Sequence, residues 1–235
     1  MALFQYDQQV VERFASIVGG VLVADGVRNG PSSAELVADF QEEQRVVLAR
    51  LGDTPLSEIP SLAAWRRAFR GFGLDPTAYR SAAEALLRRL TKQGSIPSIN
   101  TLVDIGNLIS IRYGLPVAVF DRRSITDGLT VRLAAGDESF TDLGSGAVEH
   151  PEPGEVIFID SAGHVAARRW CWRQSAESAS SESTTDVLVT VEGHHDEARH
   201  DVDAAVSDLE RLLVRSTGAS SVRTSTVDGA NPAVG

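Results

Sequence analysis

Cysteine and lysine are almost absent from this chain, which carries one of each, Cys171 and Lys92. A single cysteine cannot form an intramolecular disulfide, and it excludes a zinc site built from four cysteines. No apolar run approaches the length of about 18 residues that a membrane-spanning helix needs. The first residues also lack the charged and apolar segments of a secretory signal. We therefore expect a cytoplasmic protein with no membrane partner.

Basic side chains are scarce relative to acidic ones: 22 lysines and arginines against 32 aspartates and glutamates give a formal net charge of −10. Such a field repels phosphate, so we expect no DNA partner and no general nucleic-acid binding. The segment from Arg66 to Lys92 is an exception, with seven basic and two acidic residues. This local charge can steer a polyanion to one face, or it can be a solvated helix face that pairs with Glu42 and Glu43.

Hydrophobic periodicity separates a helical first part from a later part rich in strands. Apolar residues recur at helical spacing in residues 10–18, 34–51, 61–69, 76–94, 101–113 and 201–214. Short apolar or alternating runs predict strands at residues 21–24, 117–121, 129–133, 155–160, 165–168 and 186–191. Helices followed by strands, without regular alternation, predict an α+β fold.

The same pattern suggests three parts. We expect residues 1–57 to form a helix–strand–helix extension packed on a main domain of residues 58–215. Residues 216–235 carry few large apolar groups, which predicts a disordered tail. No dinucleotide-binding glycine motif, phosphate loop, nucleophile elbow or kinase signature is present, and we expect no cofactor.

Three histidines near residue 200 raise the question of a metal site. His200 follows His194 and His195 by six and five positions, whereas two ligands on one helix face are four apart. We therefore predict no metal there, and interpret the segment as the start of a surface helix with acidic residues in its first turn.

Aromatic and basic side chains alternate in residues 168–173. In a strand, Trp170 and Trp172 would share one face, while Arg169, Cys171 and Arg173 would share the other. Two indoles beside guanidinium groups can stack a nucleobase. A buried tryptophan pair with a solvated arginine face fits the pattern equally well.

Polar residues interrupt the apolar helix predicted at 101–113. Asn107 and Ser110 lie on one side of it together with Val103. Buried polar side chains need hydrogen-bond partners, so this pair can order a neighbouring loop or bind a ligand.

Several segments together resemble the B3/B4 domain of the phenylalanyl-tRNA synthetase β subunit. They are residues 86–90, 96–110, 115–121, 128–132, 136–140 and 154–160. They occur in the family's order, and the resemblance extends over about residues 60 to 215. It implies a mixed α/β or α+β fold with sheets packed around central helices.

The resemblance also implies a function, because this domain is the editing module of the synthetase and hydrolyses mischarged tyrosyl-tRNA. The chain carries neither the remainder of a β subunit nor a class II catalytic core, so it resembles a free-standing B3/B4 protein. We expect an aminoacyl-tRNA deacylase whose partner is aminoacyl-tRNA, and no amino-acid activation.

Single residues match the family in part. Asn107 matches a pocket asparagine, and Glu192 falls where the synthetase has a glutamate that recognises the polar group of the wrong amino acid. Ala118 stands where the family often has a histidine. The glycine-rich pocket wall of the family corresponds to residues 169–173, which are bulkier here, so the amino acid can differ from tyrosine.

These considerations give a set of predicted site residues. For positioning substrate or water, and as catalytic residues, we predict Asn107, Ser110 and Glu192. For binding the substrate, including its terminal adenosine, we predict Trp170, Trp172, Arg173 and Thr185. For contact with tRNA we predict Arg66, Arg67, Arg88 and Arg89. The alternatives are a non-catalytic module that binds tRNA or an amino acid, and a metal hydrolase that uses the three histidines.

Overall fold

A computed structural model describes residues 2–235. Its helices are α1 (Gln8–Arg13), α2 (Ala34–Leu51), α3 (Pro60–Gly71), α4 (Ala82–Gln93), α5 (Thr101–Tyr113) and α6 (Ala198–Thr217), with short 3-10 turns η1 (Leu56–Glu58) and η2 (Arg122–Ser124). Its strands are β1 (Phe4–Tyr6), β2 (Val18–Asp25), β3 (Val117–Asp121), β4 (Leu129–Leu133), β5 (Phe140–Thr141), β6 (Val148–Glu149), β7 (Val156–Ile159), β8 (Val165–Arg168), β9 (Arg173–Gln174), β10 (Asp186–Gly193), β11 (Ser221–Asp228) and β12 (Ala233–Val234). The predicted α+β class is confirmed.

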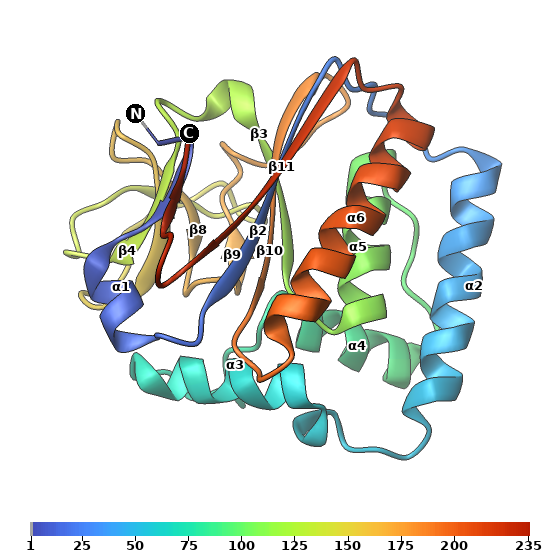
Figure 1. Ribbon diagram of the computed structural model, residues 1–235, viewed down its shortest axis with the longest axis horizontal. Helices are drawn as coiled ribbons and strands as arrows, with labels where there is room; N and C mark the ends of the chain where they lie inside the picture. The colour runs from blue at the N-terminus through green and yellow to red at the C-terminus, as the bar shows by residue number, and fades with distance from the viewer. Residues whose placement is uncertain (1) are drawn as a thin grey trace.

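Two larger sheets organise the molecule. A four-stranded sheet has the order β11-β2-β10-β3, and a six-stranded sheet has the order β12-β1-β4-β7-β8-β9. Helices α5 and α6 pack against one face of the four-stranded sheet, with α2 outside them (Figure 1). The opposite face of that sheet shares a hydrophobic core with the six-stranded sheet. The four-stranded sheet is therefore the middle layer.

Strand alternation explains how one sheet serves two cores. On β10, Val187, Val189 and Val191 belong to the helix-side core, while Leu188 belongs to the core between the sheets. Because successive side chains of a strand point to opposite faces, the even-numbered residues of β10 face the six-stranded sheet. This parity places Glu192 between the two sheets.

The N-terminal residues are part of both sheets. β2 lies between β10 and β11, and β1 pairs with β4 and β12. The predicted helix at 10–18 ends at Arg13, and Gly19 and Gly20 lie inside β2. A Cβ atom at Gly20 would lie 2.3 Å from a methyl group of Val206, so the glycine lets α6 approach the strand closely.

The C-terminal tail is ordered, contrary to the expectation from its composition. β11 pairs with β2 along eight residues, and β12 pairs with β1. Backbone hydrogen bonds hold this polar segment in the sheets. Amino-acid composition does not predict them, because every residue type except proline has the same backbone donor and acceptor. In addition, the helix predicted from Pro76 begins at Ala82, because Asp75 and Thr77 form a side-chain turn and Ser81 caps the helix. No helix in residues 2–235 has the length and hydropathy to cross a membrane.

Candidate functional site

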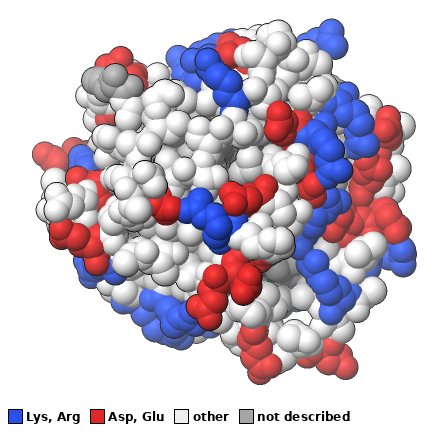
Figure 2. All heavy atoms as spheres, viewed as in Figure 1, with Lys and Arg blue, Asp and Glu red and all other residues white. Residues whose placement is uncertain are grey.

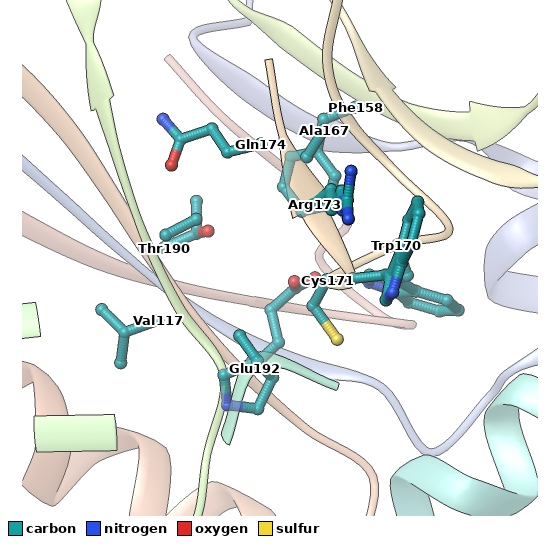
Figure 3. Close-up of a pocket in the computed structure, with 13 residues that line it drawn as sticks. Val117, Phe158, Ala167, Trp170, Cys171, Arg173, Gln174, Thr190 and Glu192 are labelled. Atoms are coloured by element: carbon teal, nitrogen blue, oxygen red, sulfur yellow. Dashed lines mark hydrogen bonds between the residues drawn. The ribbon is translucent and has the colours of Figure 1, made fainter. Parts of the chain in front are cut away.

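A small cavity lies beside β10 on the face of the sheet that carries Glu192. Its volume is about 80 Å³, and Figure 3 shows 13 residues around it. β10 contributes Thr190 and Glu192, and β3 contributes Ala118, which pairs with Thr190 across the sheet. The opposite wall comes from the loop between β8 and β9 and contains Trp170 and Trp172. The cavity thus lies where the two sheets approach each other.

Glu192 is a buried carboxylate with two hydrogen-bond donors from distant parts of the chain. The hydroxyl of Tyr6 donates to Oε1 over 2.7 Å, and the indole N–H of Trp170 donates to the same oxygen over 3.1 Å. The indole N–H of Trp65 donates to the backbone carbonyl of Glu192. Burial raises the pKa of Glu192 to about 7, although the two side-chain hydrogen bonds lower it. A carboxyl group that titrates near neutral pH in a cavity is typical of functional sites.

The indole wall is a tight hairpin loop, so Trp170 and Trp172 do not share the face that the alternation of residues 168–173 would give them in a strand. β8 and β9 pair through Arg168 and Arg173, so residues 169–172 form the turn. Arg169 and Trp170 have φ angles of 48° and 60°, in the left-handed region that non-glycine residues rarely adopt. Such conformations persist only where the surroundings fix them, and they cluster at functional sites.

Backbone hydrogen bonds fix this hairpin loop on both sides. The N–H of Trp170 donates to the carbonyl of Val156, and the N–H of Ala82 donates to the carbonyl of Cys171. Cys171 lines the cavity, and burial, followed by the charge of Glu192, raises the pKa of its thiol. A thiol held protonated is a poor nucleophile.

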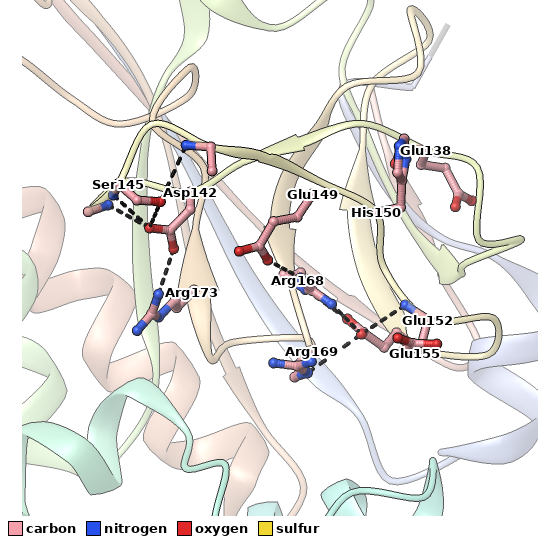
Figure 4. Close-up of polar contacts among 12 residues, drawn as sticks. Glu138, Asp142, Ser145, Glu149, His150, Glu152, Glu155, Arg168, Arg169 and Arg173 are labelled. Carbon is pink, nitrogen blue, oxygen red and sulfur yellow. Dashed lines mark hydrogen bonds and ion pairs between the residues drawn. The ribbon is translucent and has the colours of Figure 1, made fainter.

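Ion pairs anchor the base of the hairpin, as Figure 4 shows. The buried guanidinium of Arg168 contacts the buried carboxylate of Glu155 over 2.7 Å and the exposed carboxylate of Glu149 over 2.6 Å. Arg173 contacts Asp142 over 2.5 Å. Burial and pairing on this scale make the hairpin a rigid wall rather than a flexible lid.

Cation–π contacts hold Trp172 in place. The guanidinium carbons of Arg169 and Arg173 each lie 4.5 Å from the centre of its ring, and Arg169 also lies 4.1 Å from the ring of Tyr79. Each stacked guanidinium group stabilises the position of an indole by about 0.5–1 kcal/mol at an exposed site. One function of the arginines in this run is therefore to fix Trp172 against the cavity.

The structure brings together some of the predicted site residues and leaves others apart. Trp170, Trp172, Arg173 and Glu192 all line the cavity. Asn107, Ser110 and Thr185 are not among its lining residues.

These three residues lie elsewhere in the fold. Asn107 is half-buried on α5. The hydroxyl of Ser110 donates to the carbonyl of Leu115 and orders the turn that leads to β3. Thr185 is exposed and contacts Asp186 at the start of β10, five positions from Thr190.

The four arginines predicted to contact tRNA lie on α3 and α4. Arg67, Arg88 and Arg89 are exposed, whereas Arg66 is largely buried against Glu84. In Figure 2, basic side chains gather at the lower left with acidic ones beside them at the bottom, and acidic and basic side chains are mixed along the right side, where α2 and α6 lie. Ala82, the first residue of α4, lines the cavity. At about 1.5 Å per residue, Arg88 lies roughly 9 Å further along that helix.

The histidines have diverging environments, and two of them are buried, which corrects the expectation of a surface helix. His194 packs edge-on against Trp65 and Trp170, with ring centroids 4.6 and 5.0 Å apart. Burial lowers its pKa to about 3. His195 instead pairs with Asp201 over 2.9 Å. Within residues 2–235, no cluster of three or more histidine, cysteine or acidic side chains is placed to hold a metal ion.

The residues that sequence reasoning missed are Tyr6, Thr190 and Gln174. Tyr6 donates to Glu192, and the other two line the cavity. Thr190 could have been predicted from the sequence, because it lies two positions before Glu192 on β10 and therefore points to the same face of the sheet. Tyr6 gives no such signal, since its partner lies 186 positions away.

Comparison with known proteins identifies a family. Residues 64–208 match the family model described as "B3/4 domain". The phenylalanine–tRNA ligase β subunit of Mycolicibacterium paratuberculosis is 32% identical over 161 residues, which is 68% of this chain and 18% of that subunit. The β subunit of Chromobacterium violaceum is 35% identical over 82 residues, 35% of this chain and 10% of that subunit.

A solved structure supports the fold. An N-terminal fragment of the phenylalanyl-tRNA synthetase β subunit from Pyrococcus horikoshii superimposes with a TM-score of 0.52 at 13% identity, over 94% of this chain and 50% of that fragment. The chain thus spans less than a fifth of the two ligase subunits above and half of this fragment. Since the family model covers more than half of its residues, the chain belongs to the B3/4 domain family.

Proposed function

We propose that this protein hydrolyses the ester bond of mischarged aminoacyl-tRNA. The observation that carries the proposal is the Glu192 carboxylate, buried at a cavity whose other wall holds Trp170, Trp172 and Arg173, in a chain of the B3/4 domain family. Phenylalanine–tRNA ligase β subunits share this domain. Editing of a charged tRNA by the same kind of cavity is the function that this chemistry supports best.

Hydrolysis of an aminoacyl ester requires few catalytic groups, because the ester is already activated. A water molecule attacks the ester carbonyl, the C–O bond to the terminal ribose breaks, and the leaving 3′ oxygen takes up a proton. Holding the water and the ester in contact can supply much of the rate. Oε1 of Glu192 is occupied by Tyr6 and Trp170, so Oε2 is the oxygen that contacts the substrate. We assign it to the α-amino group or to the attacking water.

The rest of the tRNA end is assigned to the basic groups near the cavity. Arg173 is half-exposed at its rim and contacts the terminal ribose or phosphate. Trp172, with the guanidinium groups of Arg169 and Arg173 stacked on its ring, walls the part of the cavity that takes the amino acid. Arg67 on α3 and Arg88 and Arg89 on α4 contact the acceptor stem, because they are exposed and lie on the two helices beside the cavity. Ser110 has a positioning role, because its hydroxyl orders the turn into β3.

A second candidate is a non-catalytic module that binds aminoacyl-tRNA or an amino acid. Ala118 favours it, because the alanine lines the cavity at the position where the family often has a histidine. Without that imidazole, Glu192 is the one titratable carboxylate that lines the cavity. A binding module would retain the pocket and lose the hydrolysis.

Deacylation of a panel of mischarged tRNAs tests the proposal. The purified chain should release the amino acid from at least one of them, and Glu192→Gln should reduce the rate by about 10²-fold or more. Ala118→Leu adds bulk to the cavity and should also abolish release, whereas Val148→Ala, on an exposed strand, is the matched control. No release across the panel at high protein concentration would rule out the hydrolase, and a salt-dependent tRNA complex without release would select the binding module.

A further inference from the structure

We propose that the cavity accepts small aminoacyl groups, of the size of alanine or serine, and rejects aromatic ones. This inference rests on the proposed function and adds the substrate class. Three features of the cavity favour small groups: its volume, the contacts that hold its indole wall, and the hydrogen bonds already made by its carboxylate.

Volume is the first feature. The cavity measures about 80 Å³. An engineered cavity that binds benzene measures about 150 Å³, so the space here is roughly half the volume of a cavity known to accept an aromatic ring. A methyl or hydroxymethyl side chain fits such a space without displacing the walls.

The fixed wall is the second feature, because a soft wall could move aside for a larger side chain. Trp172 is clamped by the guanidinium groups of Arg169 and Arg173, each 4.5 Å from its ring centre. Trp170 is held by its backbone bond to Val156 and by its indole bond to Glu192. Moving either indole breaks several contacts at once, a cost that binding an aromatic substrate would have to overcome.

The occupied carboxylate is the third feature. A phenolic hydroxyl already donates to Oε1 of Glu192, and it belongs to Tyr6 of the protein itself. Tyr6 approaches from the Gly19 side of β2, where a Cβ atom would lie 2.2 Å from its hydroxyl. The hydroxyl of Tyr6 therefore already occupies the hydrogen-bonding position on Glu192 that the phenol of a tyrosyl substrate would need. Of the Glu192 carboxylate, Oε2 remains to contact a substrate, with the hydroxyl of Thr190 beside it on β10.

The test uses 3′-aminoacylamino-adenosine analogues, in which an amide replaces the hydrolysable ester, with alanyl, seryl and tyrosyl groups. Binding is followed by the fluorescence of the tryptophans in the wall and by calorimetry. Wild-type protein should bind the alanyl and seryl analogues at least about tenfold more tightly than the tyrosyl one. Trp172→Ala should raise affinity for the tyrosyl analogue, while Val148→Ala should leave the order unchanged. Cys171→Gly enlarges the same wall and serves if the tryptophan variant does not fold.

The outcomes separate this inference from the proposed function. Equal or tighter binding of the tyrosyl analogue by wild-type protein, or no binding of any analogue, would overturn the inference. Release of tyrosine from tyrosyl-tRNA as fast as alanine from alanyl-tRNA would overturn it too, and would leave the hydrolase intact. Size-selective analogue binding without release from any charged tRNA would retain the inference and remove the hydrolase.

Discussion

The phenolic oxygen of Tyr6 lies 2.7 Å from Oε1 of Glu192, across 186 positions of sequence. Burial of the phenol, with the adjacent carboxylate, raises the pKa of Tyr6 well above its ordinary value, so Tyr6 remains a donor at all physiological pH values. The pair joins β1 of one sheet to β10 of the other. It is therefore both a structural link between the sheets and the base of the candidate site.

Glu192→Gln should change how stability depends on pH. The pKa of Glu192 is raised from 4.5 to about 7 in the folded protein. Between these values the folded chain holds a proton that the unfolded chain releases, so the free energy of unfolding falls as pH rises and is level above pH 7. The fall amounts to roughly 3 kcal/mol. His194 contributes an opposite slope, so urea unfolding from pH 4.5 to 8 is read as the difference in free energy of unfolding between each variant and wild type. That difference should change by this amount across the range for Glu192→Gln and stay level for the exposed variant Glu182→Gln; a level difference for both variants would contradict the prediction.

His194→Phe should protect the protein against acid. Burial, with the charges of His195 and Arg67, lowers the pKa of His194 from 6.5 to about 3. In this window the unfolded chain binds a proton that the folded chain excludes, so stability is lost as pH falls, by roughly 5 kcal/mol in all. Phenylalanine keeps the aromatic packing and cannot titrate. Thermal unfolding at pH 4 and pH 7 should show a smaller loss for His194→Phe than for wild type, whereas the exposed control His164→Gln should behave like wild type.

Gly19→Ala should dislodge Tyr6. The new Cβ would lie 2.2 Å from the Tyr6 hydroxyl, so either the ring or the strand must move, at a cost of about 1–3 kcal/mol. Gly106→Ala is the matched control, because its Cβ meets methyl groups of Val119 and Val117 at 3.2 and 3.7 Å, and alanine favours a helix interior. Denaturant unfolding should show a loss for the first variant and little change for the second. Equal effects would mean that the approach of Tyr6 to β2 is not constrained.

Arg168→Ala should destabilise the hairpin wall. It leaves the carboxylate of Glu155, itself 3% exposed, without its main partner, and breaking a buried pair in this way costs about 3–5 kcal/mol. Arg211→Ala removes an exposed arginine that pairs with Asp208 and should cost less than about 1 kcal/mol. Calorimetric melting of both variants gives the comparison. A loss no larger for Arg168→Ala than for Arg211→Ala would show that the buried pair adds nothing.

Much of the fold could be predicted, because its strongest elements are locally encoded. The apolar runs at 117–121, 129–133 and 165–168 mark β3, β4 and β8, and the pattern at 101–113 marks α5. Asn100 and Ser33 cap α5 and α2 with their side chains, which is the local chemistry that helix starts require. The α+β class followed from these elements.

The features that the sequence did not reveal depend on contacts between distant residues. Gly19 and Gly20 look like a helix stop, but they lie in β2 because Tyr6 and α6 need the space that side chains would fill. The tail looks disordered because its side chains are polar, but its backbone completes a sheet. Trp170 and Trp172 look like neighbours on a strand face, but they belong to a turn that hydrogen bonds, ion pairs and cation–π contacts stabilise.

The strand order has a consequence for how the molecule assembles. β2, built from residues 18–25, receives both of its neighbours from the last quarter of the chain, β10 and β11. Pairing between strands that are distant in sequence slows folding, because the entropic cost of closing a long loop comes before the stabilising contacts form. During synthesis the first partner of β2, which is β10, ends at residue 193, and the second, β11, ends at residue 228, so both edges of this apolar strand stay unpaired until most of the chain has emerged from the ribosome. A chaperone that shields this segment should therefore raise the yield of folded protein more than a slower rate of translation would.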